Sequence, residues 1–78
     1  MKVKDFIKLL RAVDQDREVI LQSDPEGNSY APFNGFWCGA YTEDGEAGME
    51  KLTKADMKLG YTEEDLVAGK PALFLVPE

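Results

Sequence analysis

The chain has a single cysteine, Cys38, and no histidine among its 78 residues. One thiol excludes an intramolecular disulfide, and the lack of histidine removes the usual zinc sites and every histidine-dependent catalytic triad. A chain of this size buries only about 60–65% of the surface that its unfolded form exposes. We therefore expect one small domain, spanning residues 1–78, that apolar packing stabilises without a metal or a cofactor.

Charge is distributed unevenly along the chain, whose net charge is −6. Residues 1–17 carry five cations, whereas residues 18–50 carry seven acids and no lysine or arginine. A stretch without cations repels a phosphate backbone, so direct nucleic-acid binding is disfavoured. An acidic balance of this size also keeps a small protein soluble.

No apolar run approaches the roughly 20 residues that a helix needs to cross a bilayer. The N-terminal segment also lacks the apolar centre of a signal peptide. Together with the lone thiol, these features predict a cytoplasmic protein without membrane contact.

The first segment has the periodicity of an amphipathic helix. Its apolar side chains recur at spacings of three and four residues, and its cations share another face. We expect this helix to end between residues 13 and 15. A helix of about a dozen residues is marginal alone, so it should pack on a sheet.

Three segments have the composition of strands: residues 18–23, about 34–42, and 72–76. Asp24, Pro25 and Gly27 predict a turn after the first of them. Because Pro32 interrupts the aromatic segment 30–42 together with two glycines, that segment predicts an irregular or bulged strand that is not central in the sheet. Asp44 and Gly45 predict a second turn, within a hairpin.

Residues 53–68 contain two similar capping patterns. Thr53 precedes Asp56 by three residues, as Thr62 precedes Asp65, which resembles a capping box with aspartate in the acidic position. Gly60 is suited to end the first helical turn. Two short helical turns are therefore expected before the last strand.

These elements predict an α+β fold. An N-terminal amphipathic helix would pack on a three- to four-stranded, mainly antiparallel sheet, with the short helical turns before the last strand. The expected core consists of apolar residues from every element: Val3, Phe6, Ile7, Leu10, Val13, Val19, Leu21, Phe36, Leu52, Leu59, Leu66, Leu73 and Leu75.

Candidates for catalysis or metal binding are weak, and we expect a protein that is not an enzyme. Cys38 has no neighbouring base in the sequence to activate it. The turn "DPEGNSY" alternates oxygen ligands as a calcium loop does, but its glycine falls at the fourth position instead of the sixth. No catalytic or metal-ligating residue is therefore assigned.

Five aromatic residues fall within twelve positions, more than one face of a small sheet can hide. Two interpretations remain open: the aromatics form only the core, or they form both core and a binding surface. Exposed aromatics rimmed by acids are typical of protein-contact hot spots and of base-stacking platforms. The candidate protein-binding residues are Tyr30, Phe33, Trp37, Tyr41, Asp24 and Glu26.

A second candidate surface follows from strand alternation. Ile20 lies opposite its neighbours on the first strand, and Phe74 lies opposite Leu73 and Leu75 on the last. A helix on one face would leave these side chains on an uncovered face. Trp37 or Phe33 would join them there. We therefore expect a homo-oligomer, most simply a two-fold dimer, with Ile20, Phe74 and an aromatic from residues 33–41 at its interface.

Three segments, "VILQSDPEGNSYAPF", "LGYTEEDL" and "PALFLVPE", resemble a group of small hypothetical proteins of tailed bacteriophages and prophages. That group shares an N-terminal helix like "VKDFIKLLRAVD" and an "S-D-x-E-G-N-x-Y-x-P" turn. No site residues are carried over from it. The resemblance implies a phage-type accessory protein that acts in the cytoplasm of the bacterial host.

Such a context favours a protein that binds and blocks a host bacterial protein or defence factor. One alternative is an oligomeric sponge that sequesters a nucleotide-derived immune signal, with aromatics stacking the base. Cations for its phosphates would then have to come from the N-terminal segment or Lys51. A structural or assembly role is the other alternative.

Overall fold

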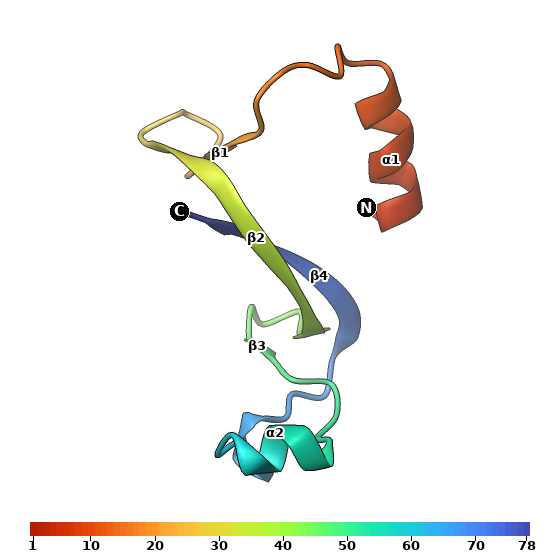
Figure 1. Cartoon of the computed structure of the whole chain (residues 1–78), viewed down its shortest axis with the longest axis vertical. Coiled ribbons are helices and arrows are strands. Elements are labelled where there is room, and N and C mark those ends of the chain that lie inside the picture. The colour runs from red at the N-terminus through yellow and green to blue at the C-terminus, as the bar shows by residue number, and fades with distance from the viewer. The chain divides into compact units, whose positions relative to one another are not determined.

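The computed structural model describes the whole chain, Met1–Glu78, and the predicted α+β class is confirmed. Two helices, a 3-10 turn and four strands follow one another (Figure 1): α1 (Val3–Arg11), β1 (Ile20–Gln22), β2 (Tyr30–Tyr41), β3 (Ala47–Gly48), α2 (Lys54–Lys58), η1 (Glu63–Asp65) and β4 (Lys70–Pro77).

The chain forms two compact units. The terminal unit comprises Met1–Gly35 and Leu75–Glu78, and the central unit comprises Phe36–Phe74. The candidate residues therefore fall into two sets, one in each unit.

Helix α1 opens the terminal unit and ends at Arg11, with Ala12 as its C-cap. Asp5 lies in its first turn and Lys8 and Arg11 in its last, as the helix dipole favours. The helix is shorter than expected, since it ends at Arg11 and not between residues 13 and 15. Of its apolar side chains, only Phe6 is half-buried and the others are exposed.

Strands β1 and β2 form the antiparallel hairpin of the terminal unit, in which Leu21 pairs with Ala31. The predicted turn between them is confirmed. The Ser23 N–H donates to the Ser29 carbonyl over 3.0 Å, and Gly27 has a φ of 78°. That left-handed conformation suits glycine, which has no Cβ to clash.

Strand β2 is continuous and central, because β1, β3 and β4 all pair with it. The prediction of an irregular or bulged strand that is not central was therefore wrong. Pro32 is tolerated because the Phe33 N–H bonds to the Val19 carbonyl, which places the adjacent Ile20–Pro32 pair at a non-hydrogen-bonded position. The β1 side of the ladder does not need the N–H that proline lacks.

Strand β4 runs antiparallel to β2, as three contacts indicate. The Glu78 N–H donates to the Pro32 carbonyl over 2.9 Å, Phe74 stacks on Trp37, and Gly69 approaches the Tyr41 backbone. Residue numbers fall along β4 as they rise along β2, and this is the antiparallel order.

The rest of the central unit also follows its local signals. Gly45 has a φ of 90° in the turn between β2 and β3. Thr53 and Thr62 both form reciprocal capping boxes, with Asp56 and Asp65 respectively. Gly60, with a φ of 99°, follows α2. The predicted turn and both caps are confirmed.

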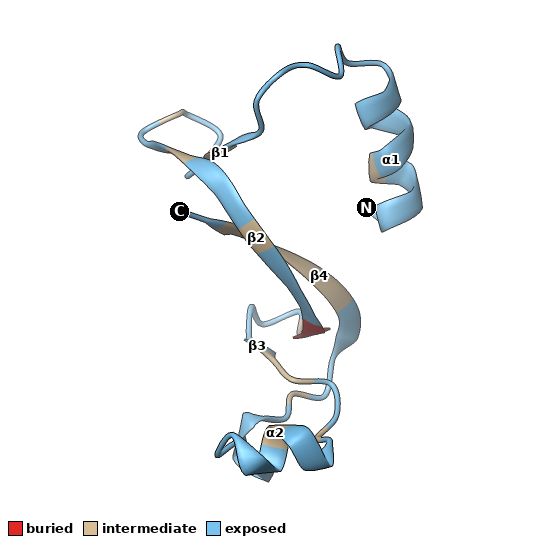
Figure 2. Ribbon diagram, viewed as in Figure 1, coloured by how far each residue is buried: buried red, intermediate tan, exposed pale blue.

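The predicted core was wrong, because one chain leaves it largely uncovered. Ala40 is the single buried hydrophobic residue, and Figure 2 shows red only at the end of β2. Periodicity identifies faces that favour burial but does not say what covers them. Phe6, Leu21, Leu52 and Leu73 are half-buried, and the remaining expected core residues are exposed: Val3, Ile7, Leu10, Val13, Val19, Phe36, Leu59, Leu66 and Leu75.

Candidate binding surface

Three aromatic side chains from β2 and β4 meet in the central unit. The rings of Trp37 and Phe74 are stacked, with centroids 4.1 Å apart and planes inclined by 16°. Tyr41 approaches Phe74 edge-on, with centroids 6.3 Å apart and planes at 65°. Offset-stacked and edge-to-face arrangements are both favourable for aromatic pairs. We call these three residues the aromatic cluster.

The lack of a side chain at Gly39 leaves room for the indole ring of Trp37. A Cβ at Gly39 would lie 2.6 Å from the Trp37 ring and would also meet the Gly48 carbonyl. The six-membered part of the indole therefore covers the backbone of Gly39, two residues further along β2. Any larger residue at position 39 would displace the indole from Phe74 or push β3 away.

The aromatic cluster is still open to solvent. Trp37 is 41% exposed and Tyr41 is 49% exposed, while Phe74 between them is half-buried. Phe74 thus holds the two outer rings in fixed orientations while leaving much of each ring uncovered. Ordered, partly exposed aromatic rings are the side chains that most often anchor protein contacts.

An acidic turn continues directly from Tyr41. The Thr42 hydroxyl and carbonyl accept hydrogen bonds from the N–H groups of Glu46 and Gly45, which closes the turn. Glu43, Asp44 and Glu46 are exposed on it. No lysine or arginine occurs between residues 18 and 50, so the aromatic cluster adjoins an anionic segment without countercharge from that stretch.

The other two predicted aromatics belong to the terminal unit. Tyr30 is exposed, and its hydroxyl lies over Gly27, where a Cβ would collide with it. Phe33 is also exposed and follows the Ile20–Pro32 pair in the β1–β2 hairpin. The four aromatics predicted to bind a protein therefore divide: Trp37 and Tyr41 join Phe74, whereas Tyr30 and Phe33 lie in the other unit.

Asp24 holds the 24–28 turn together. Its carboxylate accepts hydrogen bonds from the Asn28 amide group at 2.9 Å, the Glu26 N–H at 2.9 Å and the Ser23 hydroxyl at 3.0 Å. These bonds, chiefly that from the Asn28 side chain, hold the pKa of Asp24 below its ordinary value of 3.8. Asp24 therefore organises the turn, while the Glu26 side chain is exposed.

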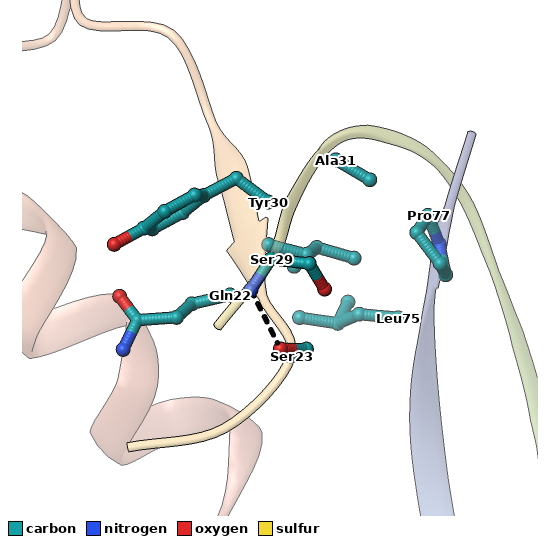
Figure 3. Close-up of a pocket in the computed structure, with 8 residues that line it drawn as sticks. Gln22, Ser23, Ser29, Tyr30, Ala31, Leu75 and Pro77 are labelled. Atoms are coloured by element: carbon teal, nitrogen blue, oxygen red, sulfur yellow. Dashed lines mark hydrogen bonds between the residues drawn. The ribbon is translucent and has the colours of Figure 1, made fainter. Parts of the chain in front are cut away.

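A depression of about 360 Å³ lies beside this turn in the terminal unit. Its apolar lining is Leu21, Ala31, Leu75 and Pro77. Figure 3 shows Leu75 and Pro77 of β4 near the bond from the Ser29 N–H to the Ser23 hydroxyl, which measures 3.1 Å. Gln22 and Tyr30 complete the lining. This depression was not predicted from the sequence, because it depends on how β4 lies against the β1–β2 hairpin.

The two residues predicted at an oligomer interface lie in separate units. Ile20 is exposed on β1 in the terminal unit, and Phe74 is the centre of the aromatic cluster. The expectation that Trp37 or Phe33 would share a face with Phe74 is met by Trp37, which stacks on Phe74 within one chain. The spacing of Trp37 and Gly39 was a further signal, since an aromatic side chain two positions from a strand glycine can cover it.

The structure shows no group of three or more histidine, cysteine, aspartate or glutamate residues placed to hold a metal ion. Cys38 is exposed. None of the helices has both the length and the apolar character required of a membrane span.

Comparisons of the chain with protein-family models, with curated proteins and with solved structures find no match.

Proposed function

We propose that this protein is a non-enzymatic accessory protein of the phage type, which binds and blocks a bacterial host protein or defence factor in the cytoplasm. The observation that carries the proposal is the aromatic cluster: Trp37 and Tyr41 flank Phe74 in fixed geometry and remain 41% and 49% exposed. The phage context rests on the sequence resemblance and not on this geometry.

The cluster has the properties of a protein-contact hot spot. Rigid aromatic anchors lose little conformational entropy on binding, because two χ angles describe each side chain and Phe74 already restricts both outer rings. A partner that covers the exposed parts of Trp37 and Tyr41 gains apolar burial at about 25 cal/mol per Å². Tyrosine and tryptophan are also the residues enriched among binding hot spots.

Charge indicates the kind of partner. Glu43, Asp44 and Glu46 follow Tyr41 in an exposed turn, and the preceding stretch contains no cation. An anionic turn beside an apolar anchor matches a partner whose own surface is basic beside an apolar pocket. Such complementarity accelerates encounter and suppresses acidic partners.

The alternative of a nucleotide-signal sponge has less support. The depression beside the 24–28 turn is large enough for part of a small molecule, and Tyr30 lines it, but none of its lining residues carries a positive charge. A phosphate there would lack the charge-assisted bonds that usually hold it. Protein binding at the aromatic cluster requires no such countercharge.

The test is an affinity capture from bacterial lysates with three baits: the parent chain, Trp37→Ala and Phe36→Ala. Phe36 is a matched control, because it is an aromatic neighbour on β2 that is 66% exposed and takes no part in the cluster. We expect a partner that the parent and Phe36→Ala retain and that Trp37→Ala loses. A partner held equally by all three baits, or none held by the parent, contradicts the proposal.

A further inference from the structure

Helix α1 carries an apolar stripe that its own chain leaves largely exposed. Val3, Ile7 and Leu10 recur at i, i+4 and i+7, and each of them is exposed, while Phe6 beside them is half-buried. The helix has nine residues. Isolated helices shorter than about 12–15 residues are marginal in water, so α1 needs a surface to pack against.

The terminal unit also carries a surface of suitable character. The depression of about 360 Å³ is lined on its apolar side by Leu21, Ala31, Leu75 and Pro77, and none of its lining residues comes from α1. The same unit therefore presents an uncovered apolar ridge and an uncovered apolar hollow. Each is the kind of surface that the other would bury.

We infer that α1 of one copy packs its apolar stripe into the depression of a second copy, whose own α1 packs reciprocally on the first. Residues 12–19, all of them exposed, connect α1 to β1 and leave the helix free to reach a neighbouring chain. Reciprocal exchange of an identical element is a common route to a two-fold dimer.

Charge complementarity supports this pairing. Lys4, Lys8 and Arg11 lie together along one flank of α1, at i, i+4 and i+7. The rest of the terminal unit beyond Arg17 contains no cation, and its four acids are Glu18, Asp24, Glu26 and Glu78. A basic helix flank therefore meets an acidic hairpin when two copies exchange their helices, which steers the encounter.

The terminal unit has no buried hydrophobic residue of its own, because Ala40, the single one in the chain, belongs to the central unit. A second copy would bury the α1 stripe and the lining of the depression together, and this would supply the terminal unit with a core.

The first experiment is sedimentation equilibrium of the full chain at micromolar concentration. We expect a species of twice the 8.7 kDa chain mass. Leu10→Lys should weaken the dimer by about 100-fold or more, because the substitution removes an apolar contact from both symmetric sites. Leu9→Lys is the matched control, since Leu9 is a leucine of the same helix that lies off the stripe and is 55% exposed against 44% for Leu10.

A monomeric parent chain overturns the inference, as does a Leu10→Lys variant that dimerises as well as Leu9→Lys. The latter outcome is expected of an interface through Ile20, because that interface does not use the α1 stripe. A Leu9→Lys variant as monomeric as Leu10→Lys also overturns it, since the effect would then not be specific to the stripe.

The second experiment mixes two variants that each lack one of the two surfaces. The mixture can form dimers only if both variants are folded. Leu10→Lys places a charge on the apolar stripe of α1 and leaves the depression unchanged. Leu75→Asp places a charge in the depression and leaves α1 unchanged. Each variant alone should be monomeric, and an equimolar mixture should recover dimers, because one intact helix then meets one intact depression. A mixture that stays monomeric overturns the reciprocal arrangement. Neither result depends on the proposed partner, since both surfaces lie in the terminal unit.

Discussion

Trp37 of β2 and Phe74 of β4 stack with their ring centroids 4.1 Å apart and their planes 16° from parallel. This contact joins two strands that are distant in the sequence, and it orders a tryptophan that is still 41% exposed. Trp37 is the only tryptophan of the chain, so its fluorescence reports on this contact without interference from another indole.

Replacing Phe74 with leucine should separate stacking from apolar volume. We expect Phe74→Leu to lower the free energy of unfolding by about 1 kcal/mol, the usual contribution of an aromatic pair beyond its buried area. The emission of Trp37 should shift to longer wavelength as its ring becomes more hydrated. A urea titration followed by fluorescence measures both quantities. Phe36→Leu is the control, and equal losses in the two variants would contradict the role of stacking.

Alanine substitutions at Gly60 and Gly35 distinguish the effect of backbone conformation on stability from the effect of packing. Gly60 has a φ of 99° and Gly35 has no left-handed φ, and a Cβ at either would meet no atom within 4 Å. Gly60→Ala should therefore destabilise the protein by about 1–2 kcal/mol, because an L side chain is strained there. Gly35→Ala should be neutral or slightly stabilising. Urea midpoints measure both, and similar midpoints for the two variants would contradict this account.

Local signals in the sequence predicted the local structure well. Two kinds of local signal were sufficient: capping threonines at Thr53 and Thr62, and turn glycines at Gly27 and Gly45. Each forms its cap or turn with residues only a few positions away in the sequence. The class of fold follows from these elements and from the hydrophobic pattern.

What the sequence could not predict depends on partners far along the chain. The central position of β2 requires knowing that Pro32 falls at a non-hydrogen-bonded pair, which the register with β1 decides. The stacking of Trp37 on Phe74 likewise depends on the pairing of β2 with β4. The core prediction failed for a third reason: the apolar face of α1 is real, but its own chain leaves it exposed.

The capping box of α2 should make stability depend on pH. Hydrogen bonds from the Thr53 N–H, and then from its hydroxyl, hold the pKa of Asp56 below its ordinary value of 3.8. A lowered folded-state pKa means that this contribution is fully present above pH 3.8. It is lost as the pH falls below that value and through the folded pKa.

Amide hydrogen exchange or urea unfolding between about pH 6 and about pH 2.5 would measure this loss. Asp56→Asn should remove the part of the pH dependence that the carboxylate contributes. The control is Asp44→Asn, since Asp44 is exposed in the 42–46 turn and receives none of the observed side-chain hydrogen bonds. A pH profile of Asp56→Asn that matches the parent would show that the cap is not the titrating element.

The acidic turn should govern the rate of association more than the lifetime of a complex. Replacing Glu43 with glutamine and Asp44 with asparagine removes two exposed charges next to Tyr41. We expect a slower association rate with the captured partner and little change in dissociation, because rim charges mainly steer encounter. Raising the salt concentration from about 0.05 M to about 0.5 M should also slow the association of the parent chain with the partner, because salt screens the same charges. Surface plasmon resonance separates the two rates, and an unchanged association rate would contradict the steering role.

The central claim is that the aromatic cluster anchors a partner protein, and the most direct test is the dissociation constant of the captured partner. Isothermal titration should compare the parent with Trp37→Ala and Phe36→Ala, each first shown to be folded by circular dichroism. A hot-spot tryptophan contributes at least about 2 kcal/mol, so Trp37→Ala should weaken binding about 30-fold or more. Phe36→Ala should stay within about threefold of the parent. Equal dissociation constants for the parent and Trp37→Ala would contradict the claim.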